Sequence, residues 1–301
     1  MADRLADTTV ILSLKISIPG NRRRVASGLV EVDADKDSIN VSKELLRSPD
    51  LARLTALDTE LRHWLYARSL PSRALKNGMY RVPLSTVEEF ETYLETYQER
   101  RRECIDRFID AYPALVEQAR ETLRDLFDAE DYPLAEVVRR SFGVEYSYLT
   151  LDTPRSLSNV SAALLARERA KAIEQAKLEV LEIQQAMREE LAALLDHAVE
   201  RLGSETGGKR RGKPKMFKDS LIANMDTFFR TFEGRNVVGD QELAGLVGEA
   251  QKILSGTNPN ELRRNSTARA VTRNSLAAVR TIMDDSLMIK PTRLISFEDE
   301  S

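Results

Sequence analysis

One stretch of the chain, Leu157–Leu202, constrains the fold most strongly, because it contains neither proline nor glycine. Apolar residues recur along it in alternating steps of four and three, the 3.5-residue period of a coiled-coil seam. At about 1.5 Å per residue the stretch predicts a helix about 70 Å long, which must bury its seam against a partner. Two polar residues in the seam cost stability but can fix the register of the pairing. The seam consists of Ala166, Ala170, Ile173, Lys177, Val180, Gln184, Met187, Leu191, Leu194 and Ala198.

A second long helix is predicted over Ser85–Ala129. It begins at a capping box, Ser85-Thr86-Val87-Glu88, and its apolar residues have the same spacing. Pro113 should kink or break this helix near Tyr112. Because the two long helices have nearly equal lengths, we expect them to pair as an antiparallel helical hairpin, a coiled-coil stalk. A homodimeric coiled coil through either helix is the alternative. The seam of this second helix is Phe90, Leu94, Tyr97, Arg101, Cys104 and Phe108.

Two alternating segments predict a small β element beside the stalk. Val10–Ile18 alternates apolar and mostly polar residues, and Gly143–Leu151 has a similar pattern. We expect these strands to pair, because a lone strand leaves its backbone groups without partners. A shorter strand is predicted at Gly28–Val32, and the acidic stretch Asp33–Asp37 is interpreted as a solvated loop rather than a calcium site.

These elements define the predicted fold class and domains. The chain should be mainly α with a small β element, in which residues 8–202 form a small α+β head with a helical stalk. Residues 203–218 are rich in glycine and basic side chains and predict a flexible linker. Residues 219–287 carry three amphipathic patterns and predict a small helical bundle. Residues 288–301 predict a tail with an acidic end.

Composition and motifs argue against several classes of function. The 301 residues include one cysteine and two histidines, so no disulfide framework and no local His/Cys metal set is expected. We find no glycine-rich phosphate loop and no Gly-x-Ser-x-Gly motif. We therefore predict no catalytic, metal-binding or cofactor-binding residues and no enzymatic activity. No apolar run is long enough for a membrane span or a signal peptide, so we expect a cytoplasmic protein with no membrane partner.

The distribution of charge gives one candidate binding segment. The whole chain has a net charge of −3, yet residues 203–297 carry 16 Lys or Arg against 10 Asp or Glu. Clustered cations could neutralise nucleic-acid phosphates, although Phe217 is the only aromatic residue among them. A solubilising linker beside a solvated helix is the alternative interpretation. The candidate nucleic-acid-binding residues are Lys209, Arg210, Arg211, Lys213, Lys215, Lys218, Arg263, Arg264, Arg269 and Arg273.

Four features of residues 8–200 together carry a family resemblance. They are the strand Val10–Ile18, Trp64 ahead of Tyr80-Arg-Val-Pro83, the long helix after Val87, and Phe142-Gly-Val-Glu-Tyr-Ser-Tyr148. In this combination the chain resembles a family of bacterial and phage proteins known only as a domain of unknown function, DUF3150. The resemblance implies a helical protein encoded on phages and mobile elements, near recombination genes or MoxR-type AAA+ ATPases. It implies a partner-dependent role in DNA processing and no catalytic residues.

The sequence as a whole predicts a non-enzymatic interaction or scaffold protein of phage or mobile-element type. It would act with a protein partner, for example an AAA+ ATPase, in DNA processing. The alternative is a protein that binds nucleic acid directly through residues 209–218, and a second alternative is a structural phage or assembly component. A homo-oligomer is compatible with each hypothesis, and the expected location is the cytoplasm of a bacterium or a phage-infected host.

Overall fold

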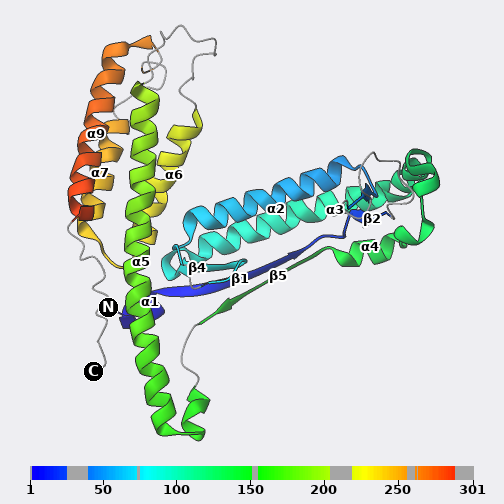
Figure 1. The fold of residues 1–301 in the computed structure, drawn as a ribbon, viewed down its shortest axis with the longest axis horizontal. Helices are drawn as coiled ribbons and strands as arrows, with labels where there is room; N and C mark the ends of the chain where they lie inside the picture. The colour runs from blue at the N-terminus through cyan, green and yellow to red at the C-terminus, as the bar shows by residue number, and fades with distance from the viewer. Residues whose placement is uncertain are drawn as a thin grey trace, which may run out of the picture. The chain divides into compact units, whose positions relative to one another are not determined.

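The computed structural model describes residues 2–25, 40–72, 75–150, 155–203, 219–255, 262 and 264–288. It is mainly helical with a small three-stranded sheet, which confirms the predicted fold class (Figure 1). The chain divides into two compact units. The first contains Met1–Thr9, Leu70–Ala74 and Asp152–Ser301, and the second contains Val10–Ser69 and Leu75–Leu151. The predicted strand Gly28–Val32 and the loop Asp33–Asp37 lie outside the described residues.

The second unit combines the sheet with two long helices that lie side by side (Figure 1). Its elements are β1 (Thr9–Ser17), β2 (Arg22–Arg24), β3 (Ser42–Glu44), α2 (Pro49–Arg68), β4 (Met79–Pro83), α3 (Val87–Leu123), α4 (Ala135–Ser141) and β5 (Gly143–Leu149). β2 and β3 form a separate two-stranded hairpin. One apolar core joins the inner face of the sheet to α2 and α3.

The central strand β1 pairs antiparallel with β5, which confirms the predicted strand pairing. Leu12 lies opposite Tyr148, and Leu14 lies opposite Tyr146, so the alternating residues of both strands reach the same core. β4 flanks β1 on its other side and was not predicted. Gly78 precedes β4 with a φ of 86°, and its carbonyl accepts a hydrogen bond from the Leu14 amide at 2.7 Å. A Cβ at this position would lie 2.7 Å from the Leu14 carbonyl oxygen, so the turn requires glycine.

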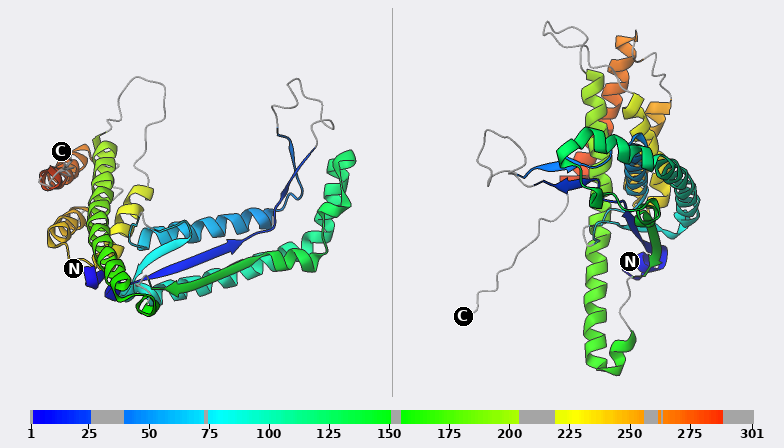
Figure 2. Two further views of the ribbon diagram at one scale, coloured as in Figure 1. Left: turned by 60° about the horizontal axis from the view of Figure 1, so that its bottom comes forward. Right: turned by 90° about the vertical axis from the view of Figure 1, so that its right-hand side faces the viewer.

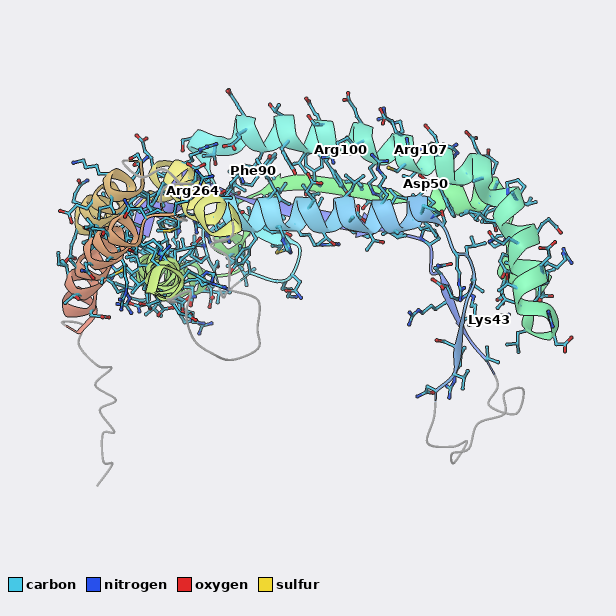
Figure 3. The ribbon with its side chains drawn as sticks, turned by 90° about the horizontal axis from the view of Figure 1, so that it is seen from above. Lys43, Asp50, Phe90, Arg100, Arg107 and Arg264 are labelled. Carbon is cyan, nitrogen blue, oxygen red and sulfur yellow. The ribbon has the colours of Figure 1, made fainter. Side chains whose placement is uncertain are left out.

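The bounds of the two long helices, α2 and α3, are set by nearby residues. The Ser48 side chain caps α2 by accepting a hydrogen bond from the Leu51 amide at 3.4 Å, and Pro49 occupies the first turn. α3 continues through Pro113 to Leu123, so the proline does not break it, and the helix changes direction in its C-terminal part (Figure 3). The predicted end at Ala129 is therefore too late, since Arg124 has a φ of 47°.

A buried ion pair connects α2, α3 and β1. Arg101 Nε lies 3.3 Å from Asp58 Oδ1, and both side chains are almost fully buried. Arg101 also donates to the backbone carbonyl of Ser17 at 2.8 Å, while the Tyr97 hydroxyl donates to Asp58 at 2.7 Å. Burial and the neighbouring Asp58 carboxylate both raise the pKa of Tyr97, so this hydroxyl stays a donor. Arg101 thus joins three elements through one polar network, in which its neighbour on the seam, Tyr97, also takes part.

We expect Arg101→Met to lower the free energy of unfolding of this unit by about 3–5 kcal/mol, because Asp58 would be left buried without its cation. The adjacent Arg100 pairs with Glu60 at 3.1 Å on the surface, so Arg100→Met serves as the matched control and should cost about 0–1 kcal/mol. Urea unfolding can be followed by the fluorescence of Trp64, the single tryptophan, which stacks on Tyr93 in this unit. Equal costs for the two substitutions would contradict the prediction.

The first unit is a helical bundle built on the longest helix of the chain. Its helices are α1 (Ala2–Thr8), α5 (Ala162–Gly203), α6 (Asp219–Arg235), α7 (Gln241–Ser255) and α9 (Ser266–Met288), with the short 3₁₀ turn η5 at Arg155–Asn159. α9 packs along the C-terminal half of α5, with α6 and α7 completing the core (Figure 1). Arg188 of α5 forms ion pairs with Asp240 at 2.9 Å and Glu242 at 2.8 Å, which fix the start of α7.

The predicted hairpin between the two long helices is wrong. α3 and α5 belong to different units; α3 buries its seam within the second unit, and α5 buries the part of its seam from Val180 onward within the first. The α3 seam is covered by α2 and the sheet, and the α5 seam is covered by helices from the C-terminal part of the chain. The spacing of a seam predicts that a helix packs against a partner, but it does not identify that partner. The units also differ from the predicted domains 8–202 and 219–287, because α5 shares one core with α6, α7 and α9.

Candidate interaction surfaces

The burial of α5 changes abruptly along its length. From Glu179 to Leu202 the helix contributes ten buried residues to the first unit, but no side chain between Ala162 and Leu178 is buried. Figure 1 and the right-hand view of Figure 2 show this N-terminal half extending beyond α6, α7 and α9. We call Ala162–Leu178, together with the exposed Leu181, the exposed half of α5. The first part of the predicted seam therefore lies in solvent.

The exposed half carries an interrupted apolar stripe. The stripe runs through the seam residues Ala166, Ala170 and Ile173 and ends at Leu181, which lies beside the buried seam residue Val180. Ile173 is 44% exposed and Leu181 is 57% exposed, which is unusual for large aliphatic side chains in one row. Lys177 interrupts the stripe and pairs with Glu174 at 2.6 Å on the same helix. A row of this kind can pack against an amphipathic helix by knobs-into-holes contacts.

The residue types in the seam, as distinct from their spacing, indicate that its first half is exposed. The exposed half places alanine at Ala166 and Ala170 and a charge at Lys177, whereas the buried half places Met187 and Leu191 at equivalent positions. Burial of an alanine removes much less apolar surface from water than burial of a leucine. The first half of the seam was therefore the weaker candidate for a permanent core, although its spacing was the same.

The two halves of α5 should respond differently to truncation. We expect Leu191→Ala to cost about 2–5 kcal/mol in the free energy of unfolding, because Leu191 is fully buried in the core of the first unit. Ile173→Ala is the matched control in the same helix and should cost less than about 0.5 kcal/mol. Urea unfolding followed by circular dichroism measures both values. A large cost for Ile173→Ala would mean that the exposed half is already packed in the isolated protein.

Most of the predicted nucleic-acid-binding residues cannot be placed. The basic run Lys209–Lys218 and Arg263 lie outside the described residues. Arg264 is exposed just before α9 and is labelled in Figure 3. Arg269 is half-buried and donates to the backbone carbonyl of Leu262 at 3.2 Å, so this cation has a structural contact.

Arg273 is a predicted nucleic-acid-binding residue that the structure places close to the end of α5. It is exposed on α9, and its Nε lies 3.0 Å from the point that a Cβ on Gly203 would occupy. Gly203 is the last residue of α5, and the basic run follows a few residues later. The fold therefore places one predicted cation of α9 against the end of α5. Further along α9, Arg280 pairs with Asp196 at 2.9 Å and with Asp284, so it is neutralised.

Cys104 and His197, other side chains with reactive or metal-binding groups, each contact a neighbouring arginine. Cys104 is buried in the core of the second unit, where Arg107 lies 3.0 Å from its sulfur. His197 is exposed and accepts a hydrogen bond from Arg201 at 3.1 Å. In the described part of the chain, no three His, Cys, Asp or Glu side chains are grouped closely enough to hold a metal ion.

Comparison with known proteins found no matching family model, no matching curated protein and no matching solved structure. The resemblance to the DUF3150 family therefore stays a prediction. Among the described helices, none is both long enough and apolar enough to cross a membrane.

Proposed function

We propose that the protein is a non-enzymatic interaction protein that binds an amphipathic helix of a protein partner along the exposed half of α5. The observation that carries this proposal is the stripe through Ala166, Ala170, Ile173 and Leu181, which lies in solvent and ends beside the buried seam residue Val180. Burying the two large aliphatic side chains against a partner helix would remove apolar surface from water on binding. An AAA+ ATPase as the partner, and DNA processing as the context, stay predictions from the sequence resemblance.

The geometry supports a helical partner rather than an extended one. The stripe follows helical spacing, so a second helix laid along it would meet a side chain at each turn. Ion pairs within α5, such as Lys171 with Glu168 at 2.9 Å, occupy side chains beside the stripe. These exposed pairs add little stability, and they leave the apolar row as the main contact surface.

A position-specific cross-link tests the proposal. A photoreactive phenylalanine analogue placed at position 173 should form a cross-link to one discrete partner in extracts of the cells that produce the protein. Gln175 is exposed on the opposite side of the same helix, so the analogue at position 175 is the matched control and should give no such product. Leu181→Asp should abolish the cross-link at position 173, because a charge would be buried in the contact.

The other outcomes of this experiment would overturn the proposal. A product with twice the mass of the chain, together with a dimer in light scattering, would mean that the stripe binds a second copy. Equal cross-linking at positions 173 and 175 would mean that the stripe has no specific partner. Mass spectrometry of the cross-linked product then identifies the partner, and purified partner should bind wild type at least tenfold more tightly than Leu181→Asp.

Direct binding of nucleic acid is the second candidate function, and the position of Arg273 favours it. Arg273 is an exposed cation against Gly203, the last residue of α5, and the basic run follows Gly203 in the sequence. Cations that neutralise phosphates release counterions, and the resulting binding weakens steeply as salt rises.

A gel-shift series at rising salt tests this second candidate. Changing Lys209, Arg210, Arg211, Lys213 and Lys215 together to Ala should weaken binding to DNA by at least tenfold and flatten its salt dependence, because fewer counterions are released. The single change Arg273→Ala should remove about one unit of salt dependence. Arg280→Ala is the control on the same helix, since Arg280 is already paired with Asp196. No binding by wild type, or unchanged binding by the five-residue variant, would contradict the candidate function.

A further inference from the structure

The second unit contains an apolar cavity that plays no part in the function proposed above. The cavity has a volume of about 210 Å³ and opens between the β2–β3 hairpin, the beginning of α2, α3 and α4. These elements gather at one end of the second unit, where Figure 3 labels Lys43 on the hairpin and Asp50 at the start of α2. Leu46, Leu51, Phe108 and Val138 form much of its wall.

The uncharged polar groups in the wall are already satisfied. Burial raises the pKa of both Tyr112 and Tyr132, so each hydroxyl stays protonated and acts as a donor within the unit. An occupant would therefore find few free hydrogen-bonding groups inside the cavity and must fill it with apolar atoms. The hydroxyls of Tyr112, Tyr132 and Ser141 donate to the backbone carbonyls of Pro133 at 2.9 Å, Leu45 at 3.1 Å and Val138, respectively. The Asn21 side chain accepts a hydrogen bond from the Leu46 amide at 2.8 Å and donates one to the Leu46 carbonyl at 2.7 Å.

The charged groups at the cavity leave one cation accessible. Asp131 Oδ2 lies 2.7 Å from Lys43 Nζ, and Asp131 Oδ1 lies 3.4 Å from Arg23 Nε. Lys43 is nearly buried and also donates to the backbone carbonyl of Leu126 at 2.6 Å, so it is fully engaged. The Arg23 side chain lines the cavity and remains 59% exposed. One carboxylate thus faces two cations, and the guanidinium of Arg23 can accept a second carboxylate in a two-pronged contact.

One lining residue of the cavity is an exposed apolar side chain, and two more exposed apolar residues lie close to lining residues in the sequence. Val137 lines it and is 54% exposed, while Leu134, one turn earlier on the chain, is 79% exposed. Ile18, next to the lining residue Pro19, is 38% exposed. An exposed apolar side chain that lines a small cavity is typical of a protein docking surface. The volume is below the range of about 300–1,000 Å³ found for small-molecule sites and suits one large side chain.

We propose that this cavity is the docking site for a segment of a partner protein that inserts one large apolar side chain and places an acidic residue beside Arg23. The proposal goes beyond the function proposed above, because it concerns the other unit and specifies a different kind of contact. It depends on the apolar wall, the accessible cation Arg23 and the exposed lining residue Val137, and not on the exposed half of α5.

Selection of peptides from a random phage-displayed library tests the proposal on the full chain. The enriched peptides should share a large apolar residue with Asp or Glu within about two positions of it. Such a peptide, made synthetically with a fluorescent label, should bind at least tenfold more weakly to Arg23→Glu, because the carboxylate would then meet a like charge. Arg22→Glu is the matched control: Arg22 is an exposed neighbour on the same strand that points to the other face of the hairpin, so its replacement should change affinity less than threefold.

Two further variants keep the test independent of folding and of the α5 proposal. Val137→Asp alters an exposed residue at the mouth, so the fold should persist while binding of an acidic peptide falls at least tenfold. Ile173→Asp, in the other unit, should leave peptide binding unchanged. The proposal is overturned if the selection enriches no peptide, if the enriched peptides lack the acidic residue, or if Arg23→Glu and Val137→Asp bind them as wild type does.

Discussion

The need to cover long apolar seams governs this structure. A helix with a 3.5-residue seam loses stability unless the seam is removed from water, and the chain has two such helices. α3 meets this requirement with α2 and a three-stranded sheet. α5 meets it over only part of its length, with three helices that follow it in the chain. The chain divides into two units because α3 and α5 are covered by different elements and form separate cores.

Polar contacts within each core fix how the seams are covered. Arg101 connects α3 to Asp58 of α2 and to the backbone of β1. These contacts fix the position of α3 along both α2 and the sheet. Arg188 has a comparable position in α5, where it holds both Asp240 and Glu242 at the start of α7. A buried arginine is costly without its carboxylate, so each network disfavours alternative packings of the same apolar residues.

The surfaces left over by this packing have different chemistry. The exposed half of α5 offers an apolar row suited to a helix, the cavity in the second unit offers an apolar hole with an accessible cation, and the end of α5 has the exposed Arg273 beside it.

The sequence by itself determined the two long helices and the β1–β5 pairing, because these depend on local periodicity. The capping box predicted at Ser85 was wrong, since α3 begins after Thr86 with no side-chain capping bond. Val10–Ile18 and Gly143–Leu151 were recognisable as partners since both alternate and each needs a neighbour. Only the tertiary structure decided which helix covers which seam, since apolar contacts are non-directional and many helices could satisfy one seam. For the same reason β4, the exposed half of α5 and the cavity beside Arg23 could not be predicted: each is defined by segments distant in sequence.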